Sequence, residues 1–382
     1  MLHFDARKPS ASHAGGNPTT AIAKQVPCSA TGKALGGFSL LEVLVSTAVL
    51  ALFVVLLTAV TDSSFRLWRN TQSSVFSFDA ARTAYDTLTR RLSQATLNTY
   101  LDYYDANWVR RNPSSSASFI PARYGRASDL HFVVDDAAAL LGGDQQGKGV
   151  FFFAPLGFSN GNATLSDLPN LLNACGYYVE FGSDSELRPS FLSSLPNRHR
   201  YRLVENVLPT QNFNTSCGGY PAFTDTNNTN DDRWITEGLA GSSSVRNILC
   251  ENIIALIIRP EVAKQDATLL GLPNEYSLTS TGYIYDSRAG RSGVSALQFA
   301  QLPPLLRVVM VAVDEKNAAR LTTDSNPPTA FKLNANWFQN PAKLDEDLAA
   351  LEAQLIDAKV DFRIFNQVIP LRGAKFSAQK EN

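Results

Sequence analysis

The sequence predicts an α+β fold, in which one long amino-terminal helix packs on a mainly antiparallel β-sheet with long loops. The first observation is that no glycine or proline occurs between Phe38 and Asn112, in a chain with 23 Gly and 19 Pro, so nothing there breaks a helix. The second is that the rest of the chain alternates strand-like segments, rich in Val, Ile, Phe and Tyr, with polar loops. With 382 residues, 44% of them hydrophobic, the chain can also bury a substantial core.

The helix begins with an apolar run over residues 38–60, in which Glu42 is the only ionisable residue. About twenty apolar residues, rising about 1.5 Å each, cross the hydrocarbon core of a bilayer, about 30 Å thick. The run is therefore predicted to be a transmembrane helix. An ionisable side chain in such a helix costs on the order of 2.5 to 3.5 kcal/mol, so Glu42 is expected to have a positively charged partner.

Over residues 61–100 the pattern becomes amphipathic, which predicts that the helix continues outside the membrane. Apolar residues recur at spacings of mostly three, four or seven, namely Phe65, Trp68, Val75, Phe78, Tyr85, Leu88, Leu92 and Ala95. That period is typical of a helix with one buried stripe. We therefore predict one continuous helix from Phe38 to about Leu97, whose second half covers a sheet.

Residues 101–382 are predicted to form an α+β body. The strand-like segments, which predict one mainly antiparallel sheet, are 129–135, 149–156, 175–182, 200–205, 251–260, 305–315 and 362–371. A second helix is predicted over 344–358, after Pro341. The long loops, rich in Ser, Asn, Gly, Asp and Pro, are 113–128, 157–170, 206–248 and 261–300.

The block Gly36-Gly37-Phe38-Ser39-Leu40-Leu41-Glu42 resembles the prepilin-type cleavage and methylation segment of type IV pilins and of the pseudopilins of type II secretion systems. The resemblance implies that a prepilin peptidase/methyltransferase cuts after Gly37, removes the leader 1–37 and methylates the amine of Phe38. Glu42 then occupies the acidic fifth position of the mature chain. The new ammonium lies one helical turn from Glu42, so the two charges can neutralise each other within one subunit or between neighbours. An ordinary secretory signal has an apolar core of only about 7 to 15 residues, whereas this run is longer and follows 37 residues. A plain single-pass anchor explains neither the glycine pair nor the glutamate.

The body also resembles one family of prepilin-type proteins, the Verru_Chthon cassette protein C proteins of Verrucomicrobia. The matching phrases run from residue 36 to residue 377 and include "CGYYVEFGSD", "RYRLVE", "ENIIALII" and "FRIFNQVIPLRGAKFS". The resemblance implies a single-pass protein of the inner membrane with its body in the periplasm, and other pilin-like subunits as partners. Orientation depends on this resemblance, because Lys24 and Lys33 before the apolar run are balanced by Arg66 and Arg69 after it.

Two classes of function follow. The first is a non-enzymatic minor pilin or pseudopilin that assembles through its helix into a type II secretion or type IV pilus-like filament. The alternative is a membrane-anchored adhesion or binding module that presents its loops to a surface, a polymer or a secreted cargo. Nucleic acid is not indicated as a partner, because the leader carries four basic residues and one acidic residue, and its removal takes the formal charge from −1 to about −4.

No catalytic site, cofactor or metal is predicted. Only His131 and His199 remain after removal of the leader, and neither stands at ligand spacing from another His or a Cys. The acidic and amide-rich segment 224–232 offers oxygen ligands for calcium, but its spacing fits no defined calcium loop, and a solvated loop is the favoured interpretation. The segment "GGDQQGKG" at 142–149 resembles a phosphate-binding P-loop, yet Gly149 replaces the required Ser or Thr and a strand-like run follows, which favours a turn.

Cysteine usage leaves two alternatives open. Cys28 would leave with the leader, and Cys175, Cys217 and Cys250 would remain in an oxidising compartment. Cys250 lies in an apolar run, so Cys175 with Cys217 is the candidate disulfide. The competing interpretation is three free thiols.

Overall fold

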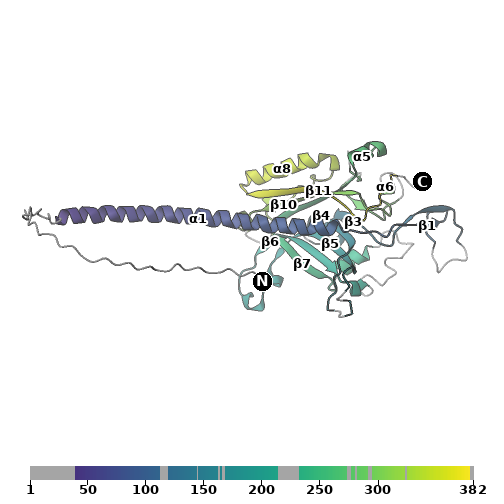
Figure 1. Cartoon of the computed structure of the whole chain (residues 1–382), viewed down its shortest axis with the longest axis horizontal. Coiled ribbons are helices and arrows are strands. Elements are labelled where there is room, and N and C mark those ends of the chain that lie inside the picture. The colour runs from purple at the N-terminus through teal and green to yellow at the C-terminus, as the bar shows by residue number, and fades with distance from the viewer. Residues whose placement is uncertain are drawn as a thin grey trace, which may run out of the picture. The chain divides into compact units, whose positions relative to one another are not determined.

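The chain combines helices with antiparallel sheets and begins with one long apolar helix, as predicted for an α+β protein (Figure 1). The computed structural model describes residues 39–111, 119–143, 145–161, 164–165, 168–213, 232–272, 277–279, 282–290, 295–322 and 325–378. The chain divides into two compact units between Ser64 and Phe65.

The long helix, α1, runs from Leu40 to Leu92. Its first part contains a stretch, Leu40–Arg69, whose most apolar window has a mean hydropathy of 2.8 and no buried residues. By length and composition, it is the one helix in the described part of the chain able to cross a membrane.

The helix ends five residues before the predicted Leu97, although no glycine or proline interrupts it. The last turn is closed by Ser93, whose Oγ donates to the carbonyl oxygen of Arg90 at 2.8 Å. The chain then turns toward the sheet, because the backbone N–H of Thr96 donates to the carbonyl oxygen of Phe153 at 2.8 Å. A tertiary hydrogen bond has replaced helical ones, which local propensity cannot predict.

Within the described residues the strands form three antiparallel sheets, where the sequence pattern predicted one. The six-stranded sheet has the order β7-β6-β5-β4-β3-β9, the three-stranded sheet β11-β10-β8, and the two-stranded ribbon β1-β2. The strands are β1 Tyr100–Tyr104, β2 Arg123–Ala127, β3 Val133–Asp136, β4 Gln145–Pro155, β5 Leu172–Ser183, β6 His199–Leu208, β7 Val245–Glu251, β8 Ile253–Glu261, β9 Tyr285–Asp286, β10 Leu305–Val313 and β11 Phe362–Pro370. The predicted segments all contain strand, while β1, β2, β7 and β9 fall partly or wholly outside them.

The remaining helices are short, apart from α8. The α-helices are α2 Ala137–Leu141, α5 Lys264–Leu270, α6 Ser295–Gln298, α7 Glu315–Leu321 and α8 Leu344–Asp357. The other helical turns are η2 Ser185–Leu187, η3 Ser190–Leu192, η4 Thr210–Asn212, the π-helix η5 Trp234–Leu239, η6 Thr329–Phe331 and η7 Pro341–Lys343. The bounds of α8 confirm the helix predicted after Pro341 to within one residue.

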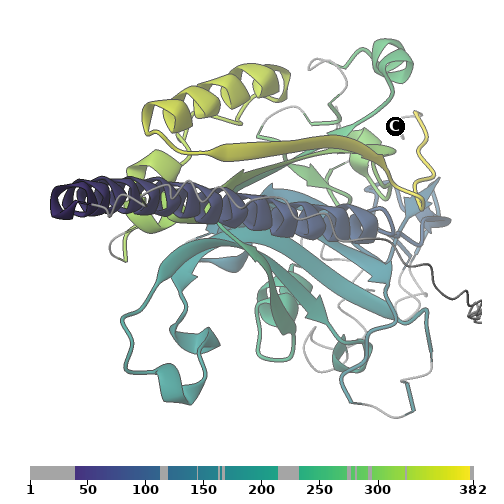
Figure 2. The ribbon, with the colours of Figure 1, turned by 60° about the vertical axis from the view of Figure 1, so that its left-hand side comes forward.

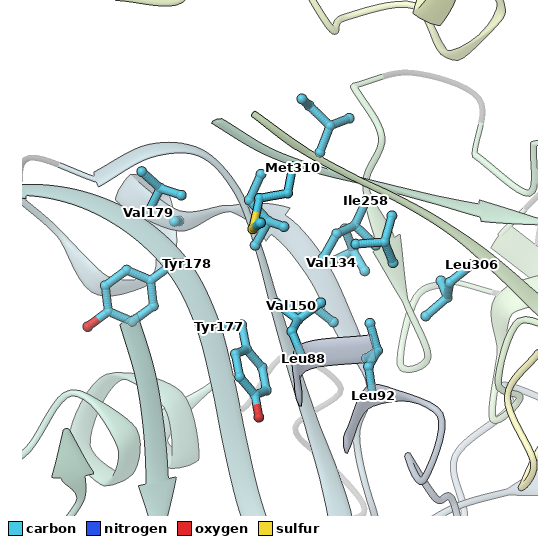
Figure 3. Close-up of a cluster of buried hydrophobic side chains, with 14 of the residues drawn as sticks. Leu88, Leu92, Val134, Val150, Tyr177, Tyr178, Val179, Ile258, Leu306 and Met310 are labelled. Atoms are coloured by element: carbon cyan, nitrogen blue, oxygen red, sulfur yellow. The ribbon is translucent and has the colours of Figure 1, made fainter. Parts of the chain in front are cut away.

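The second part of α1 contributes to the main hydrophobic core. Its buried side chains are Ala81, Ala84, Tyr85, Leu88 and Leu92. Leu88 and Leu92 lie among side chains of both larger sheets, including Val150 of β4 and Met310 of β10 (Figure 3). Figure 2 shows this part of α1 between β11 on one side and β6 on the other.

The predicted apolar stripe is buried only in its second half. Phe65 and Trp68 are 51% and 63% exposed, whereas Tyr85, Leu88 and Leu92 are at most 4% exposed. The helical period is the same in both halves, but only the second half has strands to pack against. Periodicity therefore located the apolar face of the helix correctly without indicating where along it the protein core begins.

Candidate functional site

The amino-terminal end of α1 is capped by Ser39. The Oγ of Ser39 accepts a hydrogen bond from the backbone N–H of Glu42 at 3.2 Å, and its carbonyl oxygen accepts from the same N–H at 2.9 Å. Ser followed three residues later by Glu is the pattern of a capping box, in which the serine satisfies a helical N–H that has no partner within the helix. The carboxylate of Glu42 also lies in the first turn, where the helix dipole favours negative charge.

Glu42 is exposed, and its carboxylate makes no ion pair or hydrogen bond within the described residues. Around it the apolar side chains are exposed too, including Leu41 at 73% and Leu44 at 60%. Because exposed apolar side chains in this number are costly in water, the surface of this segment requires lipid or another protein. Gly37 and Phe38, the predicted processing residues, lie outside the described part of the chain.

The opposite end of α1 holds a carboxylate in a contrasting environment. Glu205 of β6 is 1% exposed and accepts hydrogen bonds from Arg91 in the last turn of α1 and from the hydroxyl of Tyr177 on β5. Asn247 of β7 donates to its second oxygen at 3.3 Å. A buried carboxylate is tolerated when it is paired and hydrogen-bonded in this way.

The groups around Glu205 respond to its charge. Burial, together with the neighbouring carboxylate, raises the pKa of Tyr177 well above its ordinary value, so its hydroxyl remains a donor. Burial acts against the charge of Arg91, but the proximity of Tyr177 and Glu205 outweighs it and raises the pKa of the guanidinium. No periodic pattern indicates this cluster, because Arg91 and Glu205 are 114 residues apart.

Two aromatic contacts bind α1 to the three-stranded sheet. The hydroxyl of Tyr85 donates to the carbonyl oxygen of Val308 on β10 at 2.8 Å, and its ring stacks on Phe365 of β11 with 5.4 Å between centroids. About two turns closer to the amino terminus, the guanidinium of Arg363 lies over the ring of Phe78, 5.5 Å from its centroid. These contacts hold the second part of α1 between two sheets.

His131 forms a hydrogen-bonded chain with an acidic partner, which raises the question of catalysis. Its Nε2 lies 2.6 Å from Oδ1 of Asp286, and its Nδ1 accepts from the indole N–H of Trp234 at 3.2 Å. Burial lowers the pKa of His131, which agrees with a neutral ring that donates through Nε2. Since both ring nitrogens are engaged, neither is free to take a proton from a substrate, and the arrangement fits a structural role.

The remaining predicted sites fall partly outside the described residues. Cys175 is fully buried on β5 as a free thiol, and burial raises its pKa; Cys217, its predicted partner, lies outside the described part. Cys250 is also a free thiol, with a pKa raised by burial to about 11. Of the acidic segment 224–232, only Asp232 is described. Within the described residues no group of three or more His, Cys, Asp and Glu side chains is placed to hold a metal ion.

The P-loop-like segment is part of a strand. Gly147, Lys148 and Gly149 belong to β4, which continues through "VFFFAP". A P-loop needs a helix at that point, with its amino-terminal N–H groups directed at a phosphate. The turn predicted over 142–149 is therefore wrong for residues 145–149, which form the start of this strand because they pair with β5 and β3.

Comparisons with protein-family models, with curated proteins and with solved structures found no match. The resemblance to prepilin-type proteins therefore rests on the sequence phrases given above.

Proposed function

We propose that this chain is a prepilin-type subunit, a minor pilin or pseudopilin. Prepilin peptidase cuts it after Gly37, and the mature helix enters a type II secretion or type IV pilus-like filament anchored in the inner membrane. The observation that carries the proposal is the carboxylate of Glu42, exposed one turn into a helix whose apolar side chains are exposed as well. Such a group is costly in a membrane unless it meets a positive charge, and cleavage would create one at Phe38.

The geometry of the helix cap at Ser39 is compatible with cleavage after Gly37 before assembly. Ser39 stands just before the first helical residue, so the bond after Gly37 lies beyond the capping residue, and cutting there leaves the cap intact. The mature chain would begin Phe38-Ser39, with its ammonium near the end of the helix. That charge opposes the helix dipole, and a carboxylate in the first turn compensates for it.

The processing step is tested by mass spectrometry of the amino terminus. The full-length gene product, purified from membranes of a host with prepilin peptidase, is expected to begin with N-methylated Phe38. A Gly37→Leu variant is expected to retain the leader, because a bulky side chain does not suit a subsite built for glycine. An intact Met1 terminus in the wild-type protein made with an active peptidase would overturn the proposal.

One observation favours the second candidate function, a membrane-anchored binding module. The ribbon β1-β2 and its turns expose a group of large apolar side chains, namely Leu101, Tyr103, Val109, Ile120 and Tyr124. Tyr103 and Tyr124 lie against each other across the ribbon, with 5.1 Å between ring centroids. Aromatic side chains are typical of the centres of protein interfaces. Deletion of residues 105–122 that abolished a partner's binding while leaving assembly unchanged would favour this candidate.

A further inference from the structure

A glycine-rich bulge at the start of β4 is not used by the proposed function. Gln146 pairs with Val179 of β5, and the next paired residue, Val150, faces Tyr177. Three residues, 147–149, are thus set against one residue of the neighbouring strand. Bulges of this kind bend a strand and redirect its side chains, and they are frequent beside binding sites.

The conformation of the bulge requires glycine at one position. Gly147 has a φ of +79°, and a Cβ there would lie 3.3 Å from the carbonyl oxygen of Leu256. Only glycine adopts this conformation without strain. The bulge brings Lys148 to a nearly enclosed position, where only 3% of the residue is exposed.

The bulge forms one wall of a cavity of about 380 Å³. Its opposite wall is the segment before α8, including Lys332, Asn334 and Trp337. This volume falls in the range of small-molecule sites, roughly 300 to 1,000 Å³.

The polar groups of the cavity include both donors and an acceptor with unused capacity. Nζ of Lys148 lies 2.8 Å from Oδ1 of Asp136, an ion pair that engages one of its three N–H donors. The Oε1 atom of Gln145 is buried and has no hydrogen-bond partner among the described residues. A buried acceptor without a partner is destabilising, and a ligand hydroxyl or N–H would offset this cost.

The floor of the cavity is fixed in place. The amide of Gln146 accepts from the hydroxyl of Tyr201 at 3.0 Å and donates to the carbonyl oxygens of Ile254 and Phe331, at 2.7 and 2.8 Å. These bonds tie β4 to β6 and β8 and leave little to reorganise on binding. A preorganised site of this kind loses less entropy when it binds a ligand.

We propose that this cavity binds a neutral carbohydrate, one or two sugar units in size. Sugar hydroxyls both donate and accept, which matches the ammonium of Lys148 and the free Oε1 of Gln145. The half-buried ring of Trp337 offers an apolar surface for the C–H face of a sugar ring. The ion pair of Lys148 with Asp136 cancels the charges of these two residues, and Lys332, the third charged residue of the lining, is exposed to solvent. The buried part of the site is therefore neutral, which favours a neutral ligand over a phosphate or a carboxylate.

Saturation-transfer NMR on the full chain tests the proposal directly. The protein is placed in lipid nanodiscs, which avoids sugar-based detergents, and is presented with maltose, cellobiose and N,N′-diacetylchitobiose, and separately with phosphate and citrate. At least one disaccharide is expected to bind at about 10 mM, a concentration that nearly fills a site with a Kd of about 1 mM. Binding of the anions alone, or of none of these compounds, would overturn the proposal.

Variants locate the site and distinguish free sugars from polymers. Trp337→Ala and Asn334→Ala, both in the lining of the cavity, are expected to weaken binding at least tenfold, whereas Phe191→Ala, at an exposed position in η3, leaves it unchanged. Equal losses in all three variants would overturn the assignment to this cavity. Competition by the corresponding polysaccharide would identify a chain end as the ligand, and its failure to compete would identify the free sugar. The sugar-binding measurements do not depend on cleavage after Gly37, so their failure would leave the proposed processing untouched.

Discussion

The two ends of α1 each involve a glutamate, and the environments of these two residues are opposite. At the amino-terminal end Glu42 is exposed, with its backbone N–H in the cap and its carboxylate without a partner among the described residues. At the carboxyl-terminal end Glu205 is buried and receives hydrogen bonds from Arg91, Tyr177 and Asn247. The protein itself thus provides hydrogen-bond and ion-pair partners for the carboxylate of Glu205, whereas any partner of the Glu42 carboxylate must come from outside the described residues.

The same contrast extends to the apolar side chains of the helix. Leu50 is 63% exposed, whereas Leu88 is completely buried by the two larger sheets. The second part of α1 is thus stabilised by the body of the protein, and the first part requires an environment outside it. Substitutions in the two parts are expected to affect different measurements, assembly in one case and unfolding in the other.

The largest effect is expected at Glu42. Glu42→Leu should be processed normally and remain in the membrane, yet be lost almost completely from the proposed filament. The reason is that the Phe38 amine of the neighbouring subunit would then lack its carboxylate partner. The measurement is recovery of the variant in crosslinked membrane complexes, compared with Glu42→Asp as the conservative control. Normal incorporation of Glu42→Leu would contradict the pairing of charges.

A large effect on stability is expected at Leu88. Leu88→Ala should lower the free energy of unfolding of the body by about 3 kcal/mol, because it leaves a cavity among well-packed side chains. Leu50→Ala, the matched control on the same helix, should leave the unfolding of the body unchanged. Urea denaturation followed by tryptophan fluorescence measures both, and equal shifts would mean that the two parts of α1 are not stabilised separately.

A smaller effect is expected at Arg91. Arg91→Met should lower the free energy of unfolding by about 2 kcal/mol, less than for a fully buried pair because its side chain is 33% exposed. Adding Glu205→Gln should recover part of the loss, since it removes the unpaired buried charge. A double-mutant cycle by urea denaturation measures the coupling, and strict additivity would show that the ion pair contributes nothing.

The smallest effect is expected from pH, and only in the body. His131 is buried with a pKa below its ordinary value of 6.5, so the unfolded chain binds more protons there than the folded one. Stability is therefore retained above pH 6.5 and falls as the pH decreases below it. Urea midpoints measured from pH 7.5 to pH 5 should show this decrease, and His131→Gln should flatten it. An unchanged slope in the variant would assign the pH dependence to other groups.

The sequence predicted the helices and strands of this fold better than it predicted how the strands pair into sheets. Helical periodicity located α1 and α8, and runs of β-branched and aromatic residues located the longer strands. It did not predict that the strands divide into separate sheets, because pairing depends on contacts such as Leu306 with Pro260 that have no local signal. The early end of α1 has the same origin, since Thr96 pairs with Phe153 across 57 residues.

The candidate site was predicted unevenly for a related reason. Glu42 was found because a charge in an apolar run is a local anomaly. The cap formed by Ser39 was not predicted, although the spacing of Ser39 to Glu42 is a signal that could have indicated it. The partners of Glu205 were not found, since they meet only in the folded sheet. Local chemistry is visible in a sequence, whereas a buried network formed by several strands is not.

The way α1 is held by the two larger sheets also has a mechanical consequence. Tension along the helix would reach the contacts of Phe78 and Tyr85 with β10 and β11 first, and the contact of Arg91 with β6 last. The load is therefore divided between the two larger sheets, and it enters two interior strands, β10 and β6, as well as the edge strand β11. A pull on α1 would thus be resisted by both sheets at once.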